Sequence, residues 1–365
     1  MKIGVPKEIK VHEYRVGLTP PSVAELVAAG HEVFVETGAG AGIDFDDAAY
    51  AAVGAQILGT AAEVFKAADM IVKVKEPQAR EIALLEARHT LFTYLHLAAD
   101  KDQALGLMKS GATCIAYETV TAPNRSLPLL KPMSEVAGRM AVQVGAHYLE
   151  KEQGGRGILL GGGPGVAPAK VAILGGGVSG LNAAQMAVGL RADVTIYDIS
   201  NDRLAELDTH FGNSIKTAYA SKAAIAAAVA NAHLVIGAVL VPGAAAPKLV
   251  TRDMLQTMKR GSVLVDIAID QGGCFETSHA TTHADPVFVE EGVIHYCVAN
   301  MPGAVARTSA FALNNATLPF ALHIANLGAE RAMALDPHLA AGLNVAGGAI
   351  RHRAVAEALD LSFEA

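Results

Sequence analysis

The stretch from Lys170 to Asp198 constrains the fold of this chain more than any other segment. An apolar run, Val171 to Leu174, has the composition of a buried parallel strand and leads into the glycine-rich turn GGGVSG. A helical pattern then continues to Arg191, and a second apolar, β-branched run ends at Asp198. Strand, turn, helix and strand within about 30 residues predict a βαβ unit.

The glycines and the acid of this unit have the spacing of a dinucleotide site. Gly175 permits a tight turn, Gly177 lets the backbone approach a pyrophosphate, and Gly180 lets the helix pack on the strand. Asp198 is placed to bind the adenosine ribose and to repel a 2′-phosphate, which favours NAD over NADP. Glycines serve turns in any α/β protein, so the prediction depends on the agreement of strand, helix and acid. Arg203 could contact a 2′-phosphate. Because Asp198 would repel that phosphate, we expect Arg203 to be solvated or to stack on the adenine.

Composition narrows the remaining possibilities. The 365 residues suffice for two domains, and 52% hydrophobic with 18% charged residues suits an α/β protein with buried parallel strands. A net charge of −7 without a basic block argues against nucleic acid as a partner. The three cysteines are scattered and lack the spacing of a metal site. They indicate a reduced, cytoplasmic compartment. The uncharged run 223–247 is better explained by a short helix and a buried strand than by a membrane span.

Strands and helices alternate along the first part of the chain, which predicts a doubly wound parallel sheet. The expected strands are Ile3 to Val5, His31 to Glu36, Met70 to Val74, Thr90 to Leu95 and Thr113 to Tyr117. After a proline-containing loop, we expect Ser134 to cap a connecting helix. A long helical pattern from 304 to about 334 is expected to return the chain to the first domain.

We therefore predict an α/β fold of two Rossmann-like doubly wound domains joined by long helices. The expected substrate domain is discontinuous and comprises residues 1–128 and 307–365. The expected dinucleotide-binding domain comprises residues 129–306. We expect the chemistry to lie in the crevice between the domains, at the carboxyl ends of their strands.

Four titratable residues follow predicted strands at such positions: Arg15, Lys75, His96 and Asp270. A guanidinium can bind a carboxylate bidentately, an ammonium can polarise a carbonyl, and an imidazole can move a proton near neutral pH. A carboxylate can stabilise water, ammonia or a cationic intermediate. Taken singly, each residue has a structural alternative as a solvated charge, a buried histidine or a turn cap. Together with a nicotinamide site they indicate hydride transfer on a small amino or keto acid.

Seven segments spread over the whole chain together resemble the L-alanine dehydrogenases: EYRVGLTPPSV, VKVKEP, TYLHLA, PMSEVAGRMAVQVGAHYLE, ILGGGVSGLNAAQMA, DIAIDQGGCFETS and HYCVANMPGAVARTSAFALNNATLP. The resemblance implies reversible oxidative deamination of L-alanine by NAD+ to pyruvate, ammonium and NADH. It implies that Arg15 and Lys75 bind the substrate. His96 would then be the general acid/base, and Asp270 would assist water and ammonia at the carbinolamine stage.

The resemblance also implies the cofactor contacts and a homohexamer. The spacing of the histidines, among them His12, His147 and His323, gives no support for a metal site, so we expect none. The implied cofactor contacts are Ser134, Gly175, Gly177, Val178, Gly180, Asp198, Arg203, Val239, Leu240, Ile267, Asp270, Val298, Asn300 and Met301. Three positions depart from the expected pattern: Ala280 and Ala306 replace proline, and Ser200 replaces asparagine. They affect loop stiffness and the rim of the cofactor site, and leave the proposed catalytic set intact.

Three alternatives stay open. The NAD(H)-binding subunit of proton-translocating transhydrogenase resembles this architecture but needs no amino-acid pocket and works beside a membrane partner. An opine-forming or lysine-type dehydrogenase would need a larger pocket. A non-catalytic NAD sensor would tolerate the loss of His96.

Overall fold

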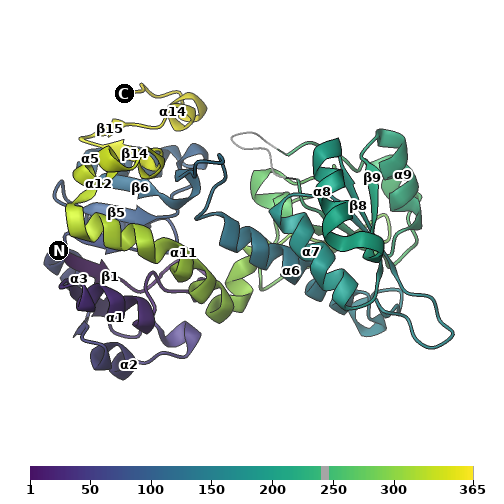
Figure 1. The fold of residues 1–365 in the computed structure, drawn as a ribbon, viewed down its shortest axis with the longest axis horizontal. Coiled ribbons are helices and arrows are strands. Elements are labelled where there is room, and N and C mark those ends of the chain that lie inside the picture. The colour runs from purple at the N-terminus through teal and green to yellow at the C-terminus, as the bar shows by residue number, and fades with distance from the viewer. Residues whose placement is uncertain (240–245, 365) are drawn as a thin grey trace. The chain divides into compact units, whose positions relative to one another are not determined.

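The computed structural model describes residues 1–239 and 246–364. They form two compact units, Met1–Met133 with Val305–Ala365 and Ser134–Ala304. Each unit is built on one largely parallel sheet with flanking helices (Figure 1). The predicted fold class, two doubly wound α/β domains of which one is discontinuous, is confirmed.

The first unit contains an eight-stranded sheet in the order β15-β14-β6-β5-β4-β1-β2-β3. Its strands are β1 (Lys2–Val5), β2 (Glu32–Glu36), β3 (Gln56–Leu58), β4 (Met70–Val72), β5 (Thr90–Thr93), β6 (Thr113–Ala116), β14 (Leu343–Ala346) and β15 (Ala349–Ile350). The first six strands are parallel and run 3-2-1-4-5-6, the order of a dinucleotide-binding sheet, with the reversal between β1 and β4. β14 and β15 add antiparallel strands beside β6, so the C-terminal segment completes a sheet begun at the N-terminus (Figure 1).

The helices of the first unit pack a continuous apolar core against this sheet. They are α1 (Pro20–Ala28), α2 (Asp47–Ala52), α3 (Ala61–Ala67), α4 (Ala79–Ile82), α5 (Lys101–Ser110), α11 (Ala306–Leu327), α12 (Ala329–Leu335), α13 (Pro337–Ala340) and α14 (Arg353–Leu359). Leu91, Leu107, Val345 and Ile350 are fully buried in one cluster. Residues from both ends of the chain share this core, and burying each such side chain contributes about 1.5–3 kcal/mol.

The second unit contains a seven-stranded sheet in the order β12-β13-β11-β10-β7-β8-β9. Its strands are β7 (Lys170–Leu174), β8 (Asp193–Asp198), β9 (Lys216–Tyr219), β10 (Leu234–Gly237), β11 (Val263–Asp266), β12 (Val287–Glu290) and β13 (Val293–Tyr296). Its helices include α7 (Val178–Gly189), α8 (Asn201–Phe211), α9 (Lys222–Asn231) and α10 (Arg252–Gln256). Apart from the antiparallel edge strand β12, the strands again run 3-2-1-4-5-6, reversing between β7 and β10.

Two helix boundaries differ from the sequence expectation. The connecting helix α6 (Lys131–Tyr148) begins three residues before Ser134, so Ser134 lies inside the helix and is not its cap. Pro132 stands in the first turn of α6, where its missing N–H costs no hydrogen bond. The helical pattern from 304 to 334 is two helices, α11 and α12, separated at Gly328 with φ +79°.

Candidate functional site

The glycine turn of the second unit has the conformation that its glycines were expected to allow. Gly175 adopts φ +104°, a region that side-chain-bearing residues avoid. A Cβ on Gly180 would lie 1.8 Å from the carbonyl oxygen of Gly175, so the turn can pack against α7 only with glycine there. The glycines at 175 and 180 are therefore required by the backbone itself.

The start of α7 can accommodate a pyrophosphate. Gly177 is the residue before the helix, and apart from its own chain neighbours no described atom lies within 4 Å of where its Cβ would stand. Val178 at the first helical position is exposed. A helix N-terminus offers unpaired N–H groups and partial positive charge, so this open space fits an anionic phosphate.

The helix α6 lies against the first turn of α7. A Cβ on Gly138 would meet the carbonyl oxygen of Ser179 at 2.2 Å, and Arg139 Nε donates to Asn182 Oδ1 at 2.9 Å. Ser134 stands four residues before Gly138 on the same helix. This packing brings the segment that carries Ser134 towards the glycine turn.

Asp198 ends β8 and is tied to the glycine turn by its carboxylate. Its Oδ2 accepts the N–H of Gly176 at 2.7 Å, and its Oδ1 accepts the N–H of Ser200 at 2.9 Å. A carboxylate offers about four acceptor sites, so it retains capacity for ribose hydroxyls. Arg203 Nε donates to the carbonyl of Gly176 at 2.6 Å, and Arg203 Nη1 pairs with Glu206 at 2.6 Å.

The other predicted cofactor residues follow β10, β11 and β13, which are linked in register to β7 and share its direction. They are Val239, then Ile267 and Asp270 in the 3-10 helix η6 (Ile267–Gln271), then Val298, Asn300 and Met301. All of them therefore lie at the same edge of the sheet as the glycine turn. Asn300 has φ +61°, and its carbonyl is bonded to a ring nitrogen of His283 at 3.2 Å. Leu240 lies outside the described residues.

Asp266, which was not predicted from the sequence, organises the turn that carries Asp270. Its carboxylate is fully buried and accepts hydrogen bonds from Ala268 N, Cys274 N and the Ser278 hydroxyl. Burial raises the pKa of this carboxyl, and the hydrogen bonds oppose the shift. Asp266 and Asp270 both occur in VLVDIAID, and periodicity alone does not distinguish the buried acid from the exposed one.

In the first unit, Arg15 is buried in a pair with Glu13. Arg15 Nε donates to Glu13 Oε1 at 2.7 Å and Nη2 donates to Oε2 at 2.5 Å, while the backbone N–H of Arg15 bonds Oε1 at 3.0 Å. Both side chains are at most 1% exposed. Burial would raise the pKa of Glu13, but the hydrogen bonds and charge of Arg15 hold it below its ordinary value. Arg15 Nη1 faces Met133 Sδ at 3.0 Å.

A second group of buried ion pairs is centred on Lys73, two residues before Lys75. Lys73 is fully buried and pairs with Glu8 at 3.1 Å and with Glu81 at 2.7 Å. Glu8 Oε1 also accepts the backbone N–H groups of Val74 and Lys75, at 2.7 and 3.3 Å. The end of β4 is therefore fixed by a carboxylate, and the Lys75 side chain extends from an anchored backbone.

His96 follows β5 in a left-handed conformation with φ +50° and ψ +34°. This conformation costs a non-glycine residue roughly 1–2 kcal/mol. Glu118 accepts the N–H groups of both Leu95 and His96, at 3.2 and 2.6 Å, and these charge-assisted bonds oppose the cost of the conformation. The His96 imidazole is exposed and stacks on the Tyr94 ring, with centroids 5.7 Å apart and planes at 10°.

Three of the four residues predicted to be catalytic or substrate-binding lie in the first unit. Arg15, Lys75 and His96 follow β1, β4 and β5, three neighbouring parallel strands. The positive charges of Arg15 and Lys75 both lower the pKa of Glu13. Tyr94, whose ring stacks on the His96 imidazole, interacts electrostatically with Arg15. Asp270 belongs to the second unit. Glu13, Glu118 and Tyr94 were not predicted from the sequence, although Glu13 stands two residues from Arg15 in the same loop.

The described residues offer no group of three or more histidine, cysteine or acidic side chains that could hold a metal ion. Within the same residues, every helix is too short or too polar to cross a membrane. Cys114, Cys274 and Cys297 are buried free thiols, and burial raises the pKa of each to about 12. Such thiols are poor nucleophiles at neutral pH.

The two sheets, the glycine turn and the polar cluster at the strand ends define a nicotinamide-dependent α/β oxidoreductase. The family model "Alanine dehydrogenase/PNT, N-terminal domain" matches residues 4–137, and "Alanine dehydrogenase/PNT, C-terminal domain" matches residues 141–353. The chain belongs to the alanine dehydrogenase/PNT family.

Individual relatives are similar over the full length. The "Alanine dehydrogenase" of Halomonas elongata is 62% identical over 363 residues, covering 100% of this chain and 98% of the relative. A solved structure of "L-alanine dehydrogenase" superposes with a TM-score of 0.96 at 54% identity and covers 99% of both chains. A transhydrogenase structure from Sinorhizobium meliloti has a TM-score of 0.84 at 29% identity, covering 97% of this chain and 100% of that one.

Proposed function

We propose that this chain is an NAD-dependent L-alanine dehydrogenase that interconverts L-alanine with pyruvate and ammonium. The observation that carries the proposal is the full-length similarity to a solved L-alanine dehydrogenase, at 54% identity and a TM-score of 0.96. The transhydrogenase fold is also close, but its identity is 29%. The arrangement of Arg15, Lys75 and His96 after adjacent strands suits a small amino acid or keto acid.

The substrate roles follow from the chemistry of each side chain. Arg15, held by Glu13, binds the substrate carboxylate, because a guanidinium matches a carboxylate in shape and charge. Lys75 polarises the carbonyl of pyruvate or the equivalent oxygen of the carbinolamine. His96 accepts a proton during water addition to the imine and returns it to the departing ammonia. Asp270 orients the water and ammonia.

The cofactor roles belong to the second unit. Bound NAD+ supplies a hydride acceptor for the Cα hydrogen of alanine. Gly175, Gly177 and Gly180 leave room for its pyrophosphate at the start of α7, with Val178 at the first helical position. Asp198 binds the adenosine ribose and disfavours a 2′-phosphate, while Arg203 lies beside the adenine. Ser134, Val239, Leu240, Ile267, Val298, Asn300 and Met301 complete the proposed contacts.

We further propose a cytoplasmic homohexamer as the working form. The support is the family resemblance and the small share of charged residues, 18% of the chain, which leaves apolar surface for subunits to cover. Sedimentation equilibrium or light scattering at micromolar concentration tests the oligomer. A monomer at those concentrations would contradict it.

A substrate panel run in both directions tests the activity. L-Alanine with NAD+ at alkaline pH should produce NADH absorbance at 340 nm, and pyruvate with ammonium should consume NADH. Serine, glycine and 2-aminobutyrate report the breadth of specificity. Lysine with 2-oxoglutarate tests opine-type chemistry, and hydride transfer from NADH to an NADP+ analogue tests the pump-subunit alternative. The proposal fails if no small amino acid supports turnover.

A further inference from the structure

We propose that Glu118 is a positioning residue for His96: its carboxylate fixes the peptide from which the imidazole extends. This inference deepens the proposed function and depends on His96 acting as the acid/base of that reaction. Glu118 lies in the 3-10 helix η3 (Tyr117–Thr119), two residues after β6. His96 lies three residues after β5, the neighbouring parallel strand.

The strand register places Glu118 beside His96. Thr93 of β5 is paired with Ala116 of β6, so the residues just beyond these strands emerge side by side. His96 N donates to Glu118 Oε1 at 2.6 Å, and Leu95 N donates to both carboxylate oxygens at 3.2 Å. Two consecutive N–H groups that converge on one anion form a small backbone nest. The carboxylate is therefore part of the turn in which His96 sits.

The left-handed conformation of His96 explains why the turn needs this carboxylate. A residue with a Cβ disfavours φ +50° and relaxes when nothing holds it there. In this conformation the N–H groups of Leu95 and His96 point to the same carboxylate. Without the acceptor, only the carbonyl side of the Leu95–His96 peptide would keep its hydrogen bond, to Gln103, so the peptide could tilt and the imidazole would move with it.

Other contacts also hold the backbone on either side of His96. The Leu95 carbonyl, which belongs to the same peptide unit as the His96 N–H, accepts Gln103 Nε2 at 3.0 Å, and the His96 carbonyl accepts the Ala99 N–H at 3.1 Å. Glu118 is the acceptor on the N–H side of that peptide unit. Tyr94 lies beneath the imidazole with its ring parallel, and its hydroxyl donates to the Leu129 carbonyl at 2.6 Å. The Tyr94 ring is thus a fixed surface on which a correctly placed imidazole stacks. Glu118 holds the His96 backbone in the conformation in which the imidazole stacks on that ring.

Two substitutions of Glu118 separate the effect of side-chain length from the effect of charge. Glu118→Gln keeps the length of the side chain and one acceptor oxygen but removes the charge. Glu118→Asp keeps the charge but withdraws the carboxylate by one methylene, which breaks hydrogen bonds of 2.6–3.2 Å. Positioning predicts that the glutamine variant is the more active of the two.

The test measures alanine turnover per NADH-binding site in the parent, Glu118→Gln, Glu118→Asp and a control, Asp47→Ala. Asp47 is a half-buried carboxylate of the same unit that accepts the Thr37 hydroxyl and the Gly38 N–H, so its loss also removes hydrogen bonds to a carboxylate, but far from His96 in the chain. NADH fluorescence titration counts the folded sites. The parent rate is measured first, because an inactive parent would overturn the proposed function rather than the role of Glu118.

In an active parent, we expect Glu118→Asp to lower kcat by roughly 10–100-fold, the effect of a displacement near 1 Å. The KM for NAD+ and the pH midpoints of kcat should stay unchanged, and Glu118→Gln should recover most of the rate. Asp47→Ala should match the parent in kcat per site. Parental kcat in Glu118→Asp, or a glutamine variant as slow as the aspartate variant, would overturn the inference.

Discussion

The backbone N–H of Gly176 donates a hydrogen bond to Asp198 Oδ2 at 2.7 Å. The acid that is expected to select the cofactor is therefore also the acid that closes the glycine turn. Since Ser200 N binds its other oxygen at 2.9 Å, the carboxylate is held from both sides before any ribose arrives. A rigid, charged acceptor of this kind discriminates against a phosphate more strongly than a mobile one.

Asp198→Asn should weaken the preference for NAD+ over NADP+. The amide keeps an oxygen for one of the two backbone N–H groups, places its NH2 group at the other, and removes the charge that repels a 2′-phosphate. Loss of one charge-assisted contact of about 1.5–3 kcal/mol should lower the ratio of kcat/KM values for NAD+ and NADP+ by roughly 10–100-fold. Asp202→Asn, four positions along on α8, is the matched control and should leave the ratio unchanged. An unaltered ratio in Asp198→Asn would mean that the ribose is held elsewhere.

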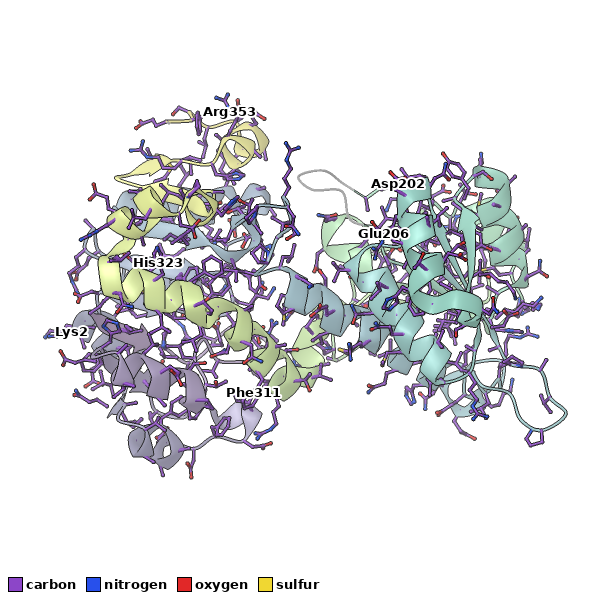
Figure 2. The ribbon with its side chains drawn as sticks, viewed as in Figure 1. Lys2, Asp202, Glu206, Phe311, His323 and Arg353 are labelled. Carbon is purple, nitrogen blue, oxygen red and sulfur yellow. The ribbon has the colours of Figure 1, made fainter. Side chains whose placement is uncertain are left out.

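Glu206→Gln should matter only once Asp198 has been neutralised. Glu206 and Asp202 both lie on α8 (Figure 2), and Glu206 pairs with Arg203 Nη1 at 2.6 Å. This pairing and the bond from Arg203 Nε to the Gly176 carbonyl keep the guanidinium against the turn. In the Asp198→Asn background, we expect the second substitution to lower the KM for NADP+ several-fold, because Arg203 can then turn towards the phosphate. Steady-state kinetics of the two single variants and the double variant check it, and simple additivity would contradict the coupling.

Glu13→Gln should destabilise the first unit and weaken substrate binding. It would remove the carboxylate that pairs directly with the buried Arg15 guanidinium, and breaking a pair as enclosed as this one costs about 3–5 kcal/mol. Urea unfolding at pH 7 measures the change, and the KM for pyruvate should rise. Glu25→Gln, on the exposed side of α1, is the control and should unfold at the parental urea midpoint.

The same pair sets a pH dependence. The pKa of Glu13 in the folded protein lies below its ordinary value of 4.5, so the stabilisation is complete above about pH 4.5 and is lost as the pH falls through the lower folded value. The stability gap between parent and Glu13→Gln should therefore narrow only in strong acid. A gap that closes near neutral pH would point to a different titrating group.

Local sequence patterns were sufficient to predict the second unit's central elements. The apolar run of β7, the glycine turn and the run ending at Asp198 each have a signature that does not depend on distant residues. The helix boundaries were less certain, because Ser134 is a good capping residue that a more favourable start with Pro132 overrides. Gly328 in a long helical pattern was the available indication that α11 and α12 are separate.

The contacts that organise the candidate site could not be predicted in the same way. Glu118 meets His96 because β5 and β6 pair in one particular register, and a shift of one residue would separate them. Lys73 lies in MIVKV beside Lys75, and the sequence does not distinguish the buried lysine from the partly exposed one. That distinction depends on Glu8 and Glu81, which approach from other segments.

His295 should make the stability of the second unit depend on pH in mild acid. Its imidazole is fully buried: one ring nitrogen bonds the Val293 carbonyl at 3.0 Å, and the other bonds the Thr277 hydroxyl at 2.8 Å. A carbonyl only accepts, so the network assigns the proton to Nδ1 and leaves Nε2 as the acceptor of a neutral ring. Burial lowers the pKa of His295 from 6.5 to about 4.

Because the folded pKa is lower, the unfolded chain binds the proton first, and stability is lost as the pH falls from 6.5 towards 4. Between pH 7.5 and 4.5, the protonation of this group should lower the free energy of unfolding by about 2–3 kcal/mol, since each pKa unit corresponds to about 1.36 kcal/mol. His295→Gln does not titrate, so its unfolding free energy should fall less over that range, whatever its stability at pH 7.5. His210→Gln, at an exposed position on α8, should keep the parental slope. Parallel urea-unfolding profiles for parent and His295→Gln would remove His295 as the source of acid sensitivity.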